Sequence, residues 1–345
     1  MTIAIRADAS AAIGLGHIKR CLSLAVALRE RGATVSFFVR SIDVDGGALI
    51  AAHGFDAHDI GSGPVGDERD DVCEFIEACE TNLPSAPTLV LADHYALGAA
   101  WHASVRGRTG ARLAAICDLG DRAMAVDLLI DPNVAADHRA KHARLPAHVQ
   151  ILGSPRYALL APNYASAPRC ELHETVRSIG IFMGGTDEAN FSELALRVLR
   201  DEVAYAGPIE IASTSGNPNL PRLRRAVDAG TATRLTLDQA DLAAFFARHD
   251  LQLGASGGAT WERCCIGAPT LAMIAAPNQR EVLLPLQHLG VVCVVPADPP
   301  TAPDIAASQR TLLADAALRR SLSMNARALV DGLGASRVAG HLLTL

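Results

Sequence analysis

The stretch Arg6-Ala-Asp-Ala-Ser-Ala-Ala-Ile-Gly-Leu-Gly-His-Ile-Lys-Arg20 follows a short apolar run that begins at Thr2. The run predicts a buried strand. Apolar residues after the stretch recur at i, i+3 and i+4, which predicts an amphipathic helix that closes at Gly32. Gly14 and Gly16 allow a tight turn and a close approach to a bound molecule. A strand, a glycine loop and a helix start, in this order, predict an α/β fold with its ligand at the loop.

His17 stands in the first turn of that predicted helix. The positive end of a helix disfavours a protonated imidazole, so we expect His17 to be neutral and able to accept a proton. Two other interpretations stay open. A dinucleotide-binding fingerprint needs a glycine at Lys19 and an acid after the second strand, where the sequence reads Phe38-Val-Arg-Ser. The other is a structural loop whose histidine only caps the helix. We favour the functional histidine.

Composition limits the class of protein. The chain has 345 residues, of which 50% are hydrophobic and 20% are charged, as expected for two globular domains. A net charge of −6 argues against nucleic-acid or membrane partners. No apolar run approaches the roughly 18 residues of a membrane span and no signal-peptide pattern is present, so we expect a cytoplasmic protein. No repeated apolar helix face suggests a dimer, so we expect a monomer.

The eight cysteines include no CxxC pair, which argues against a zinc or disulfide framework, and we expect neither a metal nor a cofactor. His138 and His142, four residues apart, invite a metal site, with His148 close behind. Without an accompanying glutamate motif, we favour a solvated polar helix over residues 134–148.

Further strands in the first half are predicted to end in polar residues. Strands are predicted at 88–92, 113–117 and 127–130, and they are followed by Asp93-His94-Tyr95, by Asp118, and by Asp131-Pro-Asn133. Ligands of α/β proteins bind beyond such strand ends, so these residues are expected to share one edge of a sheet. The remaining elements predicted here are a strand at 34–39, helices at 46–53 and about 72–80, and a surface loop over 60–71.

The second half repeats the alternation of strands and helices. Two Rossmann-like domains that face a cleft are therefore the predicted architecture. The predicted domains are residues 1–162, with the histidine, and 172–345, with a linker over 160–175. Two amphipathic helices are predicted from about residue 303. They either pack back on the first domain or cap the second. Strands are predicted at 176–182, 209–212, 233–235, 251–254 and 268–275, and helices up to about 201, at 220–227 and at 239–248.

Two glycine loops of the second half follow predicted strands, namely Gly184-Gly185-Thr186 and Ser256-Gly257-Gly258-Ala259-Thr260. Bare amides, a hydroxyl and a helix start make a cradle for a diphosphate. Neither loop is a P-loop, because no Gly-Lys-Ser/Thr follows, so ATP hydrolysis is not indicated. Glu262 lies one turn into the following helix. It either accepts both hydroxyls of a ribose or only complements the helix dipole.

The chain resembles one family over roughly residues 2–295. It is similar to the UDP-2,4-diacetamido-2,4,6-trideoxy-β-L-altropyranose hydrolases of bacterial pseudaminic acid biosynthesis, a route linked to flagellin glycosylation. That family resembles in fold the GT-B glycosyltransferases, notably MurG, the lipid-II-forming N-acetylglucosaminyltransferase. The segments that carry the resemblance are Arg6 to Arg20, Asp93-His-Tyr95, Tyr157-Ala-Leu-Leu160, Met183-Gly-Gly-Thr-Asp187, Thr260-Trp-Glu-Arg263 and Asn278-Gln-Arg280.

The resemblance implies that water displaces UDP at the anomeric carbon with inversion, without a metal. It implies that His17 is the catalytic base, and that Tyr95 and Asn278 hold the sugar or the attacking water. The alternatives are a packing ring for Tyr95 and a helix N-cap for Asn278 and Gln279. The residues implied to bind UDP or the sugar are Asp8, Gly14, Gly16, Arg20, Gly184, Gly185, Thr186, Ser256, Gly257, Thr260, Glu262 and Gln279. Asp8 and Arg20 flank His17, so they either tune or position the histidine or bind the acetamido groups of the sugar.

Four other activities fit parts of this pattern. The first is a GT-B glycosyltransferase with the same donor, although residues 40–80 lack the basic, apolar patch expected for a lipid acceptor. The second is a hydrolysing UDP-sugar 2-epimerase, which lacks the Gly-x-Gly-His block. The third is a non-catalytic UDP-sugar binder, which has no use for a poised histidine. The fourth is attack on phosphorus, which typically recruits a divalent metal.

Overall fold

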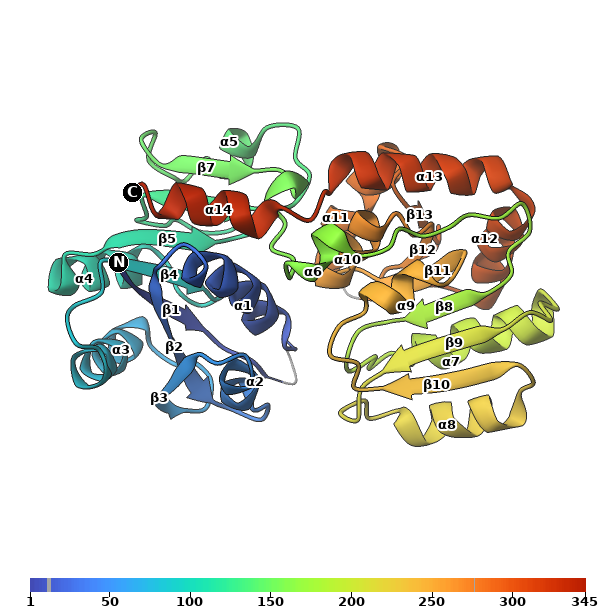
Figure 1. Cartoon of the computed structure of the whole chain (residues 1–345), viewed down its shortest axis with the longest axis horizontal. Coiled ribbons are helices and arrows are strands. Elements are labelled where there is room, and N and C mark those ends of the chain that lie inside the picture. The colour runs from blue at the N-terminus through green and yellow to red at the C-terminus, as the bar shows by residue number, and fades with distance from the viewer. Residues whose placement is uncertain (11–13, 276) are drawn as a thin grey trace. The chain divides into compact units, whose positions relative to one another are not determined.

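The computed structural model describes residues 1–10, 14–275 and 277–345, and only the backbone of Pro277 and Asn278. The chain divides into two units, Met1–Pro162 with Gly332–Leu345, and Asn163–Asp331. Each unit contains one parallel sheet with helices, as the alternating pattern predicted (Figure 1). The second unit ends at Asp331 and not at the C terminus, because the last helix packs in the first unit.

The first unit is built on a seven-stranded sheet in the order β3-β2-β1-β4-β5-β6-β7. Its strands are β1 (Thr2–Ala7), β2 (Thr34–Ser41), β3 (Asp56–Ser62), β4 (Leu89–Asp93), β5 (Arg112–Ile116), β6 (Leu128–Asp131) and β7 (Gln150–Gly153). Its helices are α1 (Gly16–Arg29), α2 (Gly46–Ala52), α3 (Glu68–Asn82), α4 (Ala99–Thr109), α5 (His138–Lys141), the 3-10 turn η1 (Pro155–Tyr157) and α14 (Gly334–Leu342).

Side chains of β1 alternate between two hydrophobic layers. Ile3 and Ile5 pack with residues of α1 and α14 on one face of the sheet. Ala4 belongs to the opposite layer, which includes residues of α3 and α4. Arg6 points to that same opposite face, because side chains two residues apart in a strand share a face. A charged side chain is thereby carried into the layer beneath α3.

The C-terminal helix α14 completes the first of these layers. Val338 and Leu342 are fully buried against the sheet, and Arg31 of the α1–β2 turn donates a hydrogen bond to Ser336. The tail from residue 303 thus contains three helices and not the two predicted. Its first two helices belong to the second unit and its last to the first unit.

Gly334 should be the least replaceable residue of α14. A Cβ atom there would lie 2.1 Å from the backbone oxygen of Ala158, so we expect Gly334→Ala to destabilise the protein by about 1–3 kcal/mol. Gly340, in the same helix, has open space within 4 Å of where a Cβ atom would stand, and Gly340→Ala should stabilise the helix by about 0.5–1 kcal/mol. Thermal unfolding of both variants measures this. Equal unfolding midpoints for the two variants would show that the backbone at Ala158 can move away from the new methyl group without loss of stability.

The second unit has a six-stranded sheet in the order β10-β9-β8-β11-β12-β13. Its strands are β8 (Ile179–Phe182), β9 (Ile209–Ser213), β10 (Thr233–Leu237), β11 (Leu251–Ala255), β12 (Thr270–Met273) and β13 (Cys293–Val294). Its helices are α6 (Asn163–Ser166), α7 (Phe191–Arg197), the π-helical turn η2 (Val198–Glu202), α8 (Leu220–Ala229), α9 (Ala243–Ala247), α10 (Gly258–Ile266), α11 (Pro277–His288), α12 (Ala302–Ala314) and α13 (Ala316–Leu329).

Two sequence predictions about the first unit are wrong. The predicted 60–71 loop begins inside β3 and ends inside α3, because β3 is an exposed edge strand with few apolar residues. The predicted solvated helix over 134–148 is only the four-residue α5. His142 is buried beyond it, and its Nε2 lies 2.9 Å from Oδ2 of Asp131, so it serves the sheet edge and not the solvent.

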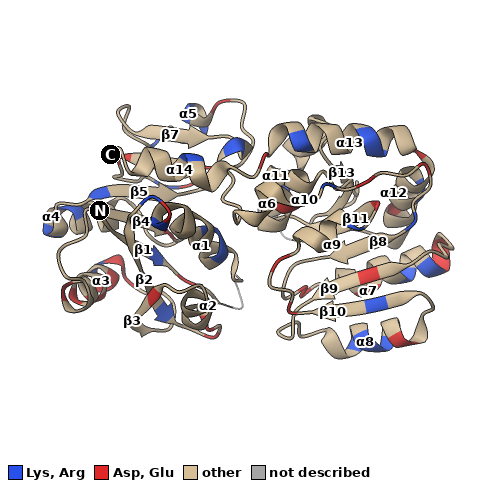
Figure 2. Cartoon of the chain, in the orientation of Figure 1, with Lys and Arg blue, Asp and Glu red and all other residues tan. Residues whose placement is uncertain are grey.

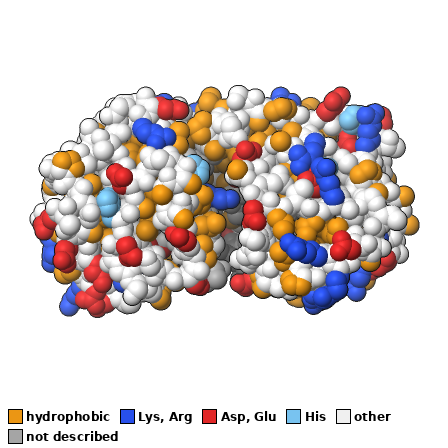
Figure 3. All heavy atoms as spheres, turned by 60° about the horizontal axis from the view of Figure 1, so that its bottom comes forward, with side chains coloured by type: hydrophobic (Ala, Val, Ile, Leu, Met, Phe, Trp, Pro, Cys, Tyr) orange, Lys and Arg blue, Asp and Glu red, His pale blue; other side chains and the backbone are white. Residues whose placement is uncertain are grey.

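Charged side chains are distributed unevenly over single helices but evenly over the visible surface. In Figure 2, α3 is marked by acidic residues and α8 by arginines. On the face that Figure 3 shows, acidic and basic side chains are intermixed on each unit. No helix in the described part of the chain is long and apolar enough to cross a membrane.

Candidate active site

The carboxyl edge of the first sheet brings the predicted polar residues together. β4, β5 and β6 are neighbouring parallel strands, so the residues that follow them lie along one edge, as predicted. Ala7, at the end of β1, is paired with Asp93 at the end of β4. The loop after β1 leads into α1, where Gly14 has a φ of +70°. His17, in the first turn of α1, therefore lies close to the end of β4.

His17 is hydrogen-bonded to Asp93. The Nδ1 atom of His17 lies 2.8 Å from Oδ1 of Asp93, and both side chains are almost fully buried. Burial raises the pKa of Asp93, but the charge of Arg20 and the hydrogen bonds from Arg20 and His17 lower it by more, so its net pKa lies well below the usual range. Asp93 is therefore an anion that can only accept. A neutral His17 must then carry its proton on Nδ1, which leaves the lone pair of Nε2 available.

Arg20 holds Asp93 in place from one turn further along α1. Its Nε donates to Oδ2 of Asp93 at 2.6 Å and its Nη2 to Oδ1 at 2.5 Å, a bidentate pair. Its Nη1 also donates to Asp118, which follows β5, at 3.2 Å. The guanidinium thus bridges the ends of two neighbouring strands. Arg20 was predicted either to position His17 or to bind the sugar; here it holds the carboxylate that is hydrogen-bonded to His17, and its binding role stays a prediction.

Tyr95 packs against His17 with a T-shaped ring contact, the two ring centroids being 4.7 Å apart. Burial, followed by the negative charge of Asp118, raises the pKa of Tyr95 to about 12. Its hydroxyl is therefore protonated at neutral pH and can donate a hydrogen bond. The residue is nevertheless 38% exposed. His17, Arg20, Asp93, Tyr95 and Asp118 form what we call the His17 cluster.

Asp8 lies in a neighbouring charged network. Its carboxylate accepts from Arg6 and from the backbone N–H of Arg40, and Nε2 of His94 is 3.2 Å from it. Arg6 also donates to Asp71 of α3, and the indole N–H of Trp101 donates to the same Asp71 at 2.8 Å. Asp8 is only 1% exposed, so its bonds here lie within the unit. Its prediction as a ligand contact stays untested.

The first glycine loop of the second unit follows β8. Gly184 has a φ of +100°, a conformation that suits glycine, and no atom lies within 4 Å of a Cβ placed on it. The backbone N–H groups at the start of α7, which follows this loop, already have an acceptor. The carboxylate of Asp187 accepts from the backbone N–H groups of Phe191 and Ser192 at 2.8 and 3.0 Å. Donors for a ligand would have to come from Gly184, Gly185 and Thr186 themselves.

The second glycine loop follows β11 and opens α10. Gly257 has a φ of +109°, and nothing lies within 4 Å of a Cβ on Gly257 or Gly258. The N terminus of α10 has no side-chain cap. Oε1 of Gln279 accepts from the N–H groups of Ala275 and Ser256, at 2.9 and 3.4 Å, and so ties the ends of β11 and β12 together. This loop therefore presents exposed glycine backbone at an uncapped helix start.

Two residues behind this loop differ in environment. Thr260 is fully buried, and its hydroxyl accepts from Arg263, so it contacts the interior of the unit. Glu262 is half-buried beside Tyr164, and its charge contributes to raising the pKa of the Tyr164 hydroxyl after burial. Neither contact tests the predicted diphosphate and ribose roles. The side chain of Asn278, predicted to be catalytic, lies outside the described residues.

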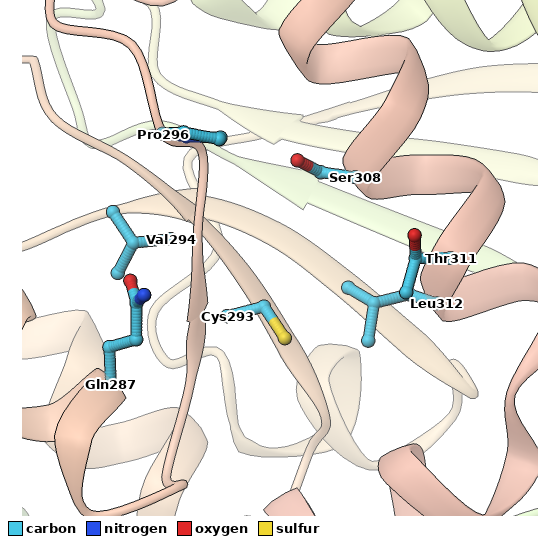
Figure 4. A pocket seen from close by; sticks show the side chains of 7 residues that line it. All are labelled: Gln287, Cys293, Val294, Pro296, Ser308, Thr311 and Leu312. Atoms are coloured by element: carbon cyan, nitrogen blue, oxygen red, sulfur yellow. The ribbon is translucent and has the colours of Figure 1, made fainter.

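A separate cavity of about 170 Å³ lies in the second unit between α11, β13 and α12 (Figure 4). Gln287, Cys293 and Ser308 are among its lining residues, and it includes none of the predicted site residues. Within the described part of the chain, no group of three or more His, Cys, Asp or Glu side chains is arranged to hold a metal ion.

Several residues of the first unit were not singled out from the sequence. Asp93 was recognised only as a strand end, although its position beyond a buried strand is a signal for the ligand edge. Arg6 is part of the segment that carries the resemblance, but no role was predicted for it, and Asp71 gave no signal because an acid on an acidic helix is ordinary. Their pairing depends on how α3 packs on the sheet.

No family model matches the chain. Among proteins of known function, it is 25% identical over 244 residues to the UDP-2,4-diacetamido-2,4,6-trideoxy-beta-L-altropyranose hydrolase of Campylobacter jejuni subsp. jejuni serotype O:2, and the match covers 70% of this chain and 80% of that protein.

Solved structures share the fold. MurG of Acinetobacter baumannii matches 100% of the chain and 99% of its own length, with a TM-score of 0.68 and 14% identity. UDP-GlcNAc 2-epimerase of Neisseria meningitidis, bound to UDP-GlcNAc, matches 100% of both chains, with a TM-score of 0.65 and 12% identity. Such similarities show the fold alone, and with the two parallel sheets they identify it as GT-B-like. The 25% identity to the Campylobacter hydrolase confirms the resemblance in sequence, and the solved structures confirm the predicted GT-B-like fold.

Proposed function

We propose that this protein hydrolyses a UDP-sugar, with UDP-2,4-diacetamido-2,4,6-trideoxy-β-L-altropyranose as substrate, as a step of pseudaminic acid biosynthesis. The observation that carries the proposal is the His17–Asp93 pair, which leaves Nε2 of His17 as a base. The similarity to the Campylobacter hydrolase supports water as the acceptor. Because the two sequences are only 25% identical, the sugar is part of the proposal.

In the proposed reaction, the oxygen of water bonds to the anomeric carbon while the bond from that carbon to the UDP oxygen breaks. Nε2 of His17 takes the water proton, and UDP leaves with the bonding electrons. Attack opposite the leaving group inverts the anomeric centre. The protonated hydroxyl of Tyr95, against the His17 ring, is suited to orient water or a sugar oxygen. We assign Asn278 to the same task.

UDP is assigned to the second unit. The amides of the partly exposed Gly184 and Gly185, and of the exposed Gly257 at the uncapped start of α10, suit the oxygens of a diphosphate. Fixed backbone dipoles of this kind stabilise the charge that develops on the leaving group. Glu262 is assigned to the ribose hydroxyls. Gln279 supports the loop by holding the Ser256 backbone.

The alternative is a glycosyltransferase that uses a related UDP-amino sugar donor. It is favoured by the match to MurG along the whole chain, since the two activities share a fold and a donor. In that case His17 deprotonates an acceptor hydroxyl in place of water. The two activities differ only in the molecule that attacks the anomeric carbon.

The test is turnover of this UDP-sugar in water enriched in oxygen-18, with products identified by mass spectrometry. We expect one labelled oxygen in the free sugar and none in UDP, because the C–O bond breaks. Label in a nucleotide product would show attack at phosphorus. Release of UDP only after an acceptor is added would show the transferase, and a sugar altered at C2 would show an epimerase.

A further inference from the structure

Arg263, in the middle of α10, buries a guanidinium to which no carboxylate of the described residues is hydrogen-bonded. The residue is 1% exposed. Its Nη2 donates to the carbonyl oxygen of Ala255 at 2.7 Å and to the hydroxyl of Thr260 at 3.3 Å. Its Nε and Nη1 are buried and have no hydrogen-bond partner. Among the ion pairs of the described residues, none joins Arg263 to a carboxylate.

This arrangement is costly for the fold. Burial lowers the pKa of Arg263 to about 10, so the group still carries its charge at neutral pH. A buried charge without a hydrogen-bonded carboxylate destabilises a protein, and the ring of Phe246, 5.8 Å from the guanidinium carbon, offsets only part of that cost. An apolar side chain of similar length would avoid the cost. The guanidinium fits only because residue 254 is a glycine, since a Cβ atom on Gly254 would lie 2.5 Å from Nη1 of Arg263. Costs of this kind are expected where function requires them.

The position of the guanidinium indicates what it serves. Its two acceptors, Ala255 and Thr260, flank the loop of Ser256, Gly257 and Gly258 on both sides. The hydroxyl of Ser256 is buried there without a partner, and the start of α10 is uncapped. Open space lies in front of both glycines. The Ser256 hydroxyl and the start of α10 thus lack a partner of the kind that an anion provides, and the guanidinium behind them lacks a hydrogen-bonded carboxylate.

We propose that Arg263 is a positioning residue for an anionic ligand at the Ser256–Gly258 loop, where it holds the loop ends and supplies charge that a bound diphosphate compensates. This inference rests on the proposed function, in which the loop binds the diphosphate of UDP. It adds that the affinity for the diphosphate depends on a residue that the ligand does not touch.

Arg319 provides a matched control in the same unit. It too is 1% exposed and lacks a carboxylate hydrogen-bond partner. Its Nη1 and Nη2 both donate, to carbonyl oxygens of Leu312, Leu313, His173 and Glu174 at 2.6 to 3.1 Å, and its Nε is buried without a partner. None of these acceptors belongs to a glycine loop. Arg319 therefore has the interactions of a structural residue, with four acceptors against the two of Arg263.

The experiment measures the dissociation constants of UDP and of uridine by calorimetry, and the unfolding midpoint, for wild type, Arg263→Met, Arg263→Lys and Arg319→Met. We expect Arg263→Met to weaken UDP binding about tenfold or more while uridine binding changes less than about twofold. Its unfolding midpoint should stay or rise. Arg263→Lys, which keeps the charge, should lose about threefold at most. Arg319→Met should lower the midpoint and leave UDP binding unchanged.

Equal loss of UDP and uridine binding in Arg263→Met, with a lowered midpoint, would show a structural role and overturn the inference. Unchanged UDP binding in a folded Arg263→Met would overturn it as well. If Arg263→Met does not fold, Arg263→Lys provides the test. Equal loss of UDP and uridine binding in Arg263→Lys would likewise show a structural role and overturn the inference. A wild type that binds neither UDP nor uridine would instead overturn the proposed function itself.

Discussion

Replacement of His17 by alanine should lower kcat/KM for UDP-sugar hydrolysis by about 10²–10⁴-fold, the usual contribution of a positioned general base. Binding of UDP should remain within about twofold of wild type, because the nucleotide is assigned to the other unit. Chromatography of released UDP gives the rate and calorimetry gives the affinity. A loss confined to turnover separates a catalytic base from a binding residue.

Lys19→Ala is the matched control for this variant. Lys19 lies two residues further along α1 and is exposed, so its replacement tests the helix without touching the His17 cluster. It should keep nearly wild-type turnover. Unimpaired turnover in His17→Ala would remove the base from the mechanism, and equal loss in both variants would mean that α1 itself had been disturbed.

Most strands were predictable because buried parallel strands are continuous apolar runs. Leu89–Asp93 and Leu251–Ala255 are fully buried, and both were predicted almost to their ends. β3 and β7 escaped prediction because they are the two edges of the first sheet. Only Ile60 of β3 is buried, so the strand has no hydrophobic signal strong enough to separate it from a loop.

The site was predictable to the level of the sheet edge and not of its contacts. A histidine after a glycine loop and a tyrosine after a strand were expected at the same edge, and their rings meet. The partner of His17 was not foreseen, since Asp93 lies 76 positions away and any of three strand ends could have supplied a carboxylate. Pairing between them depends on side-chain directions that packing decides.

Asp131 is a second residue whose contacts could not be predicted from the sequence. It ends β6 just as Asp93 ends β4, and from the sequence both were equal candidates. In the structure its carboxylate contacts Lys141 and His142 and accepts from the backbone N–H of Asn133. Two residues with one sequence signal thus have different tasks, one beside the proposed base and one in the support of a loop.

Replacement of Asp93 by asparagine should lower kcat/KM about 10²–10⁴-fold although every atom position is kept. Arg20 requires an acceptor at Oδ2 and again at Oδ1, and an asparagine offers only one. If its amide NH₂ faces Nδ1 of His17, that nitrogen must become the acceptor. The proton then sits on Nε2, and the side chain can no longer accept a proton from water. Turnover and UDP affinity are measured as for His17→Ala.

The pH profile distinguishes this effect from simple loss of stability. In the wild type Asp93 stays ionised, since its pKa lies well below the usual range, so its contribution to turnover should not vary with pH near neutrality. In Asp93→Asn the wrong tautomer of His17 persists at every pH, so the loss of kcat/KM should be of similar size wherever the variant is folded. Asp131→Asn, at the end of a neighbouring buried strand, removes a carboxylate that does not touch His17. It should lower stability and leave kcat/KM of the folded protein in place, whereas equal losses of kcat/KM in both variants would reduce Asp93 to a structural residue.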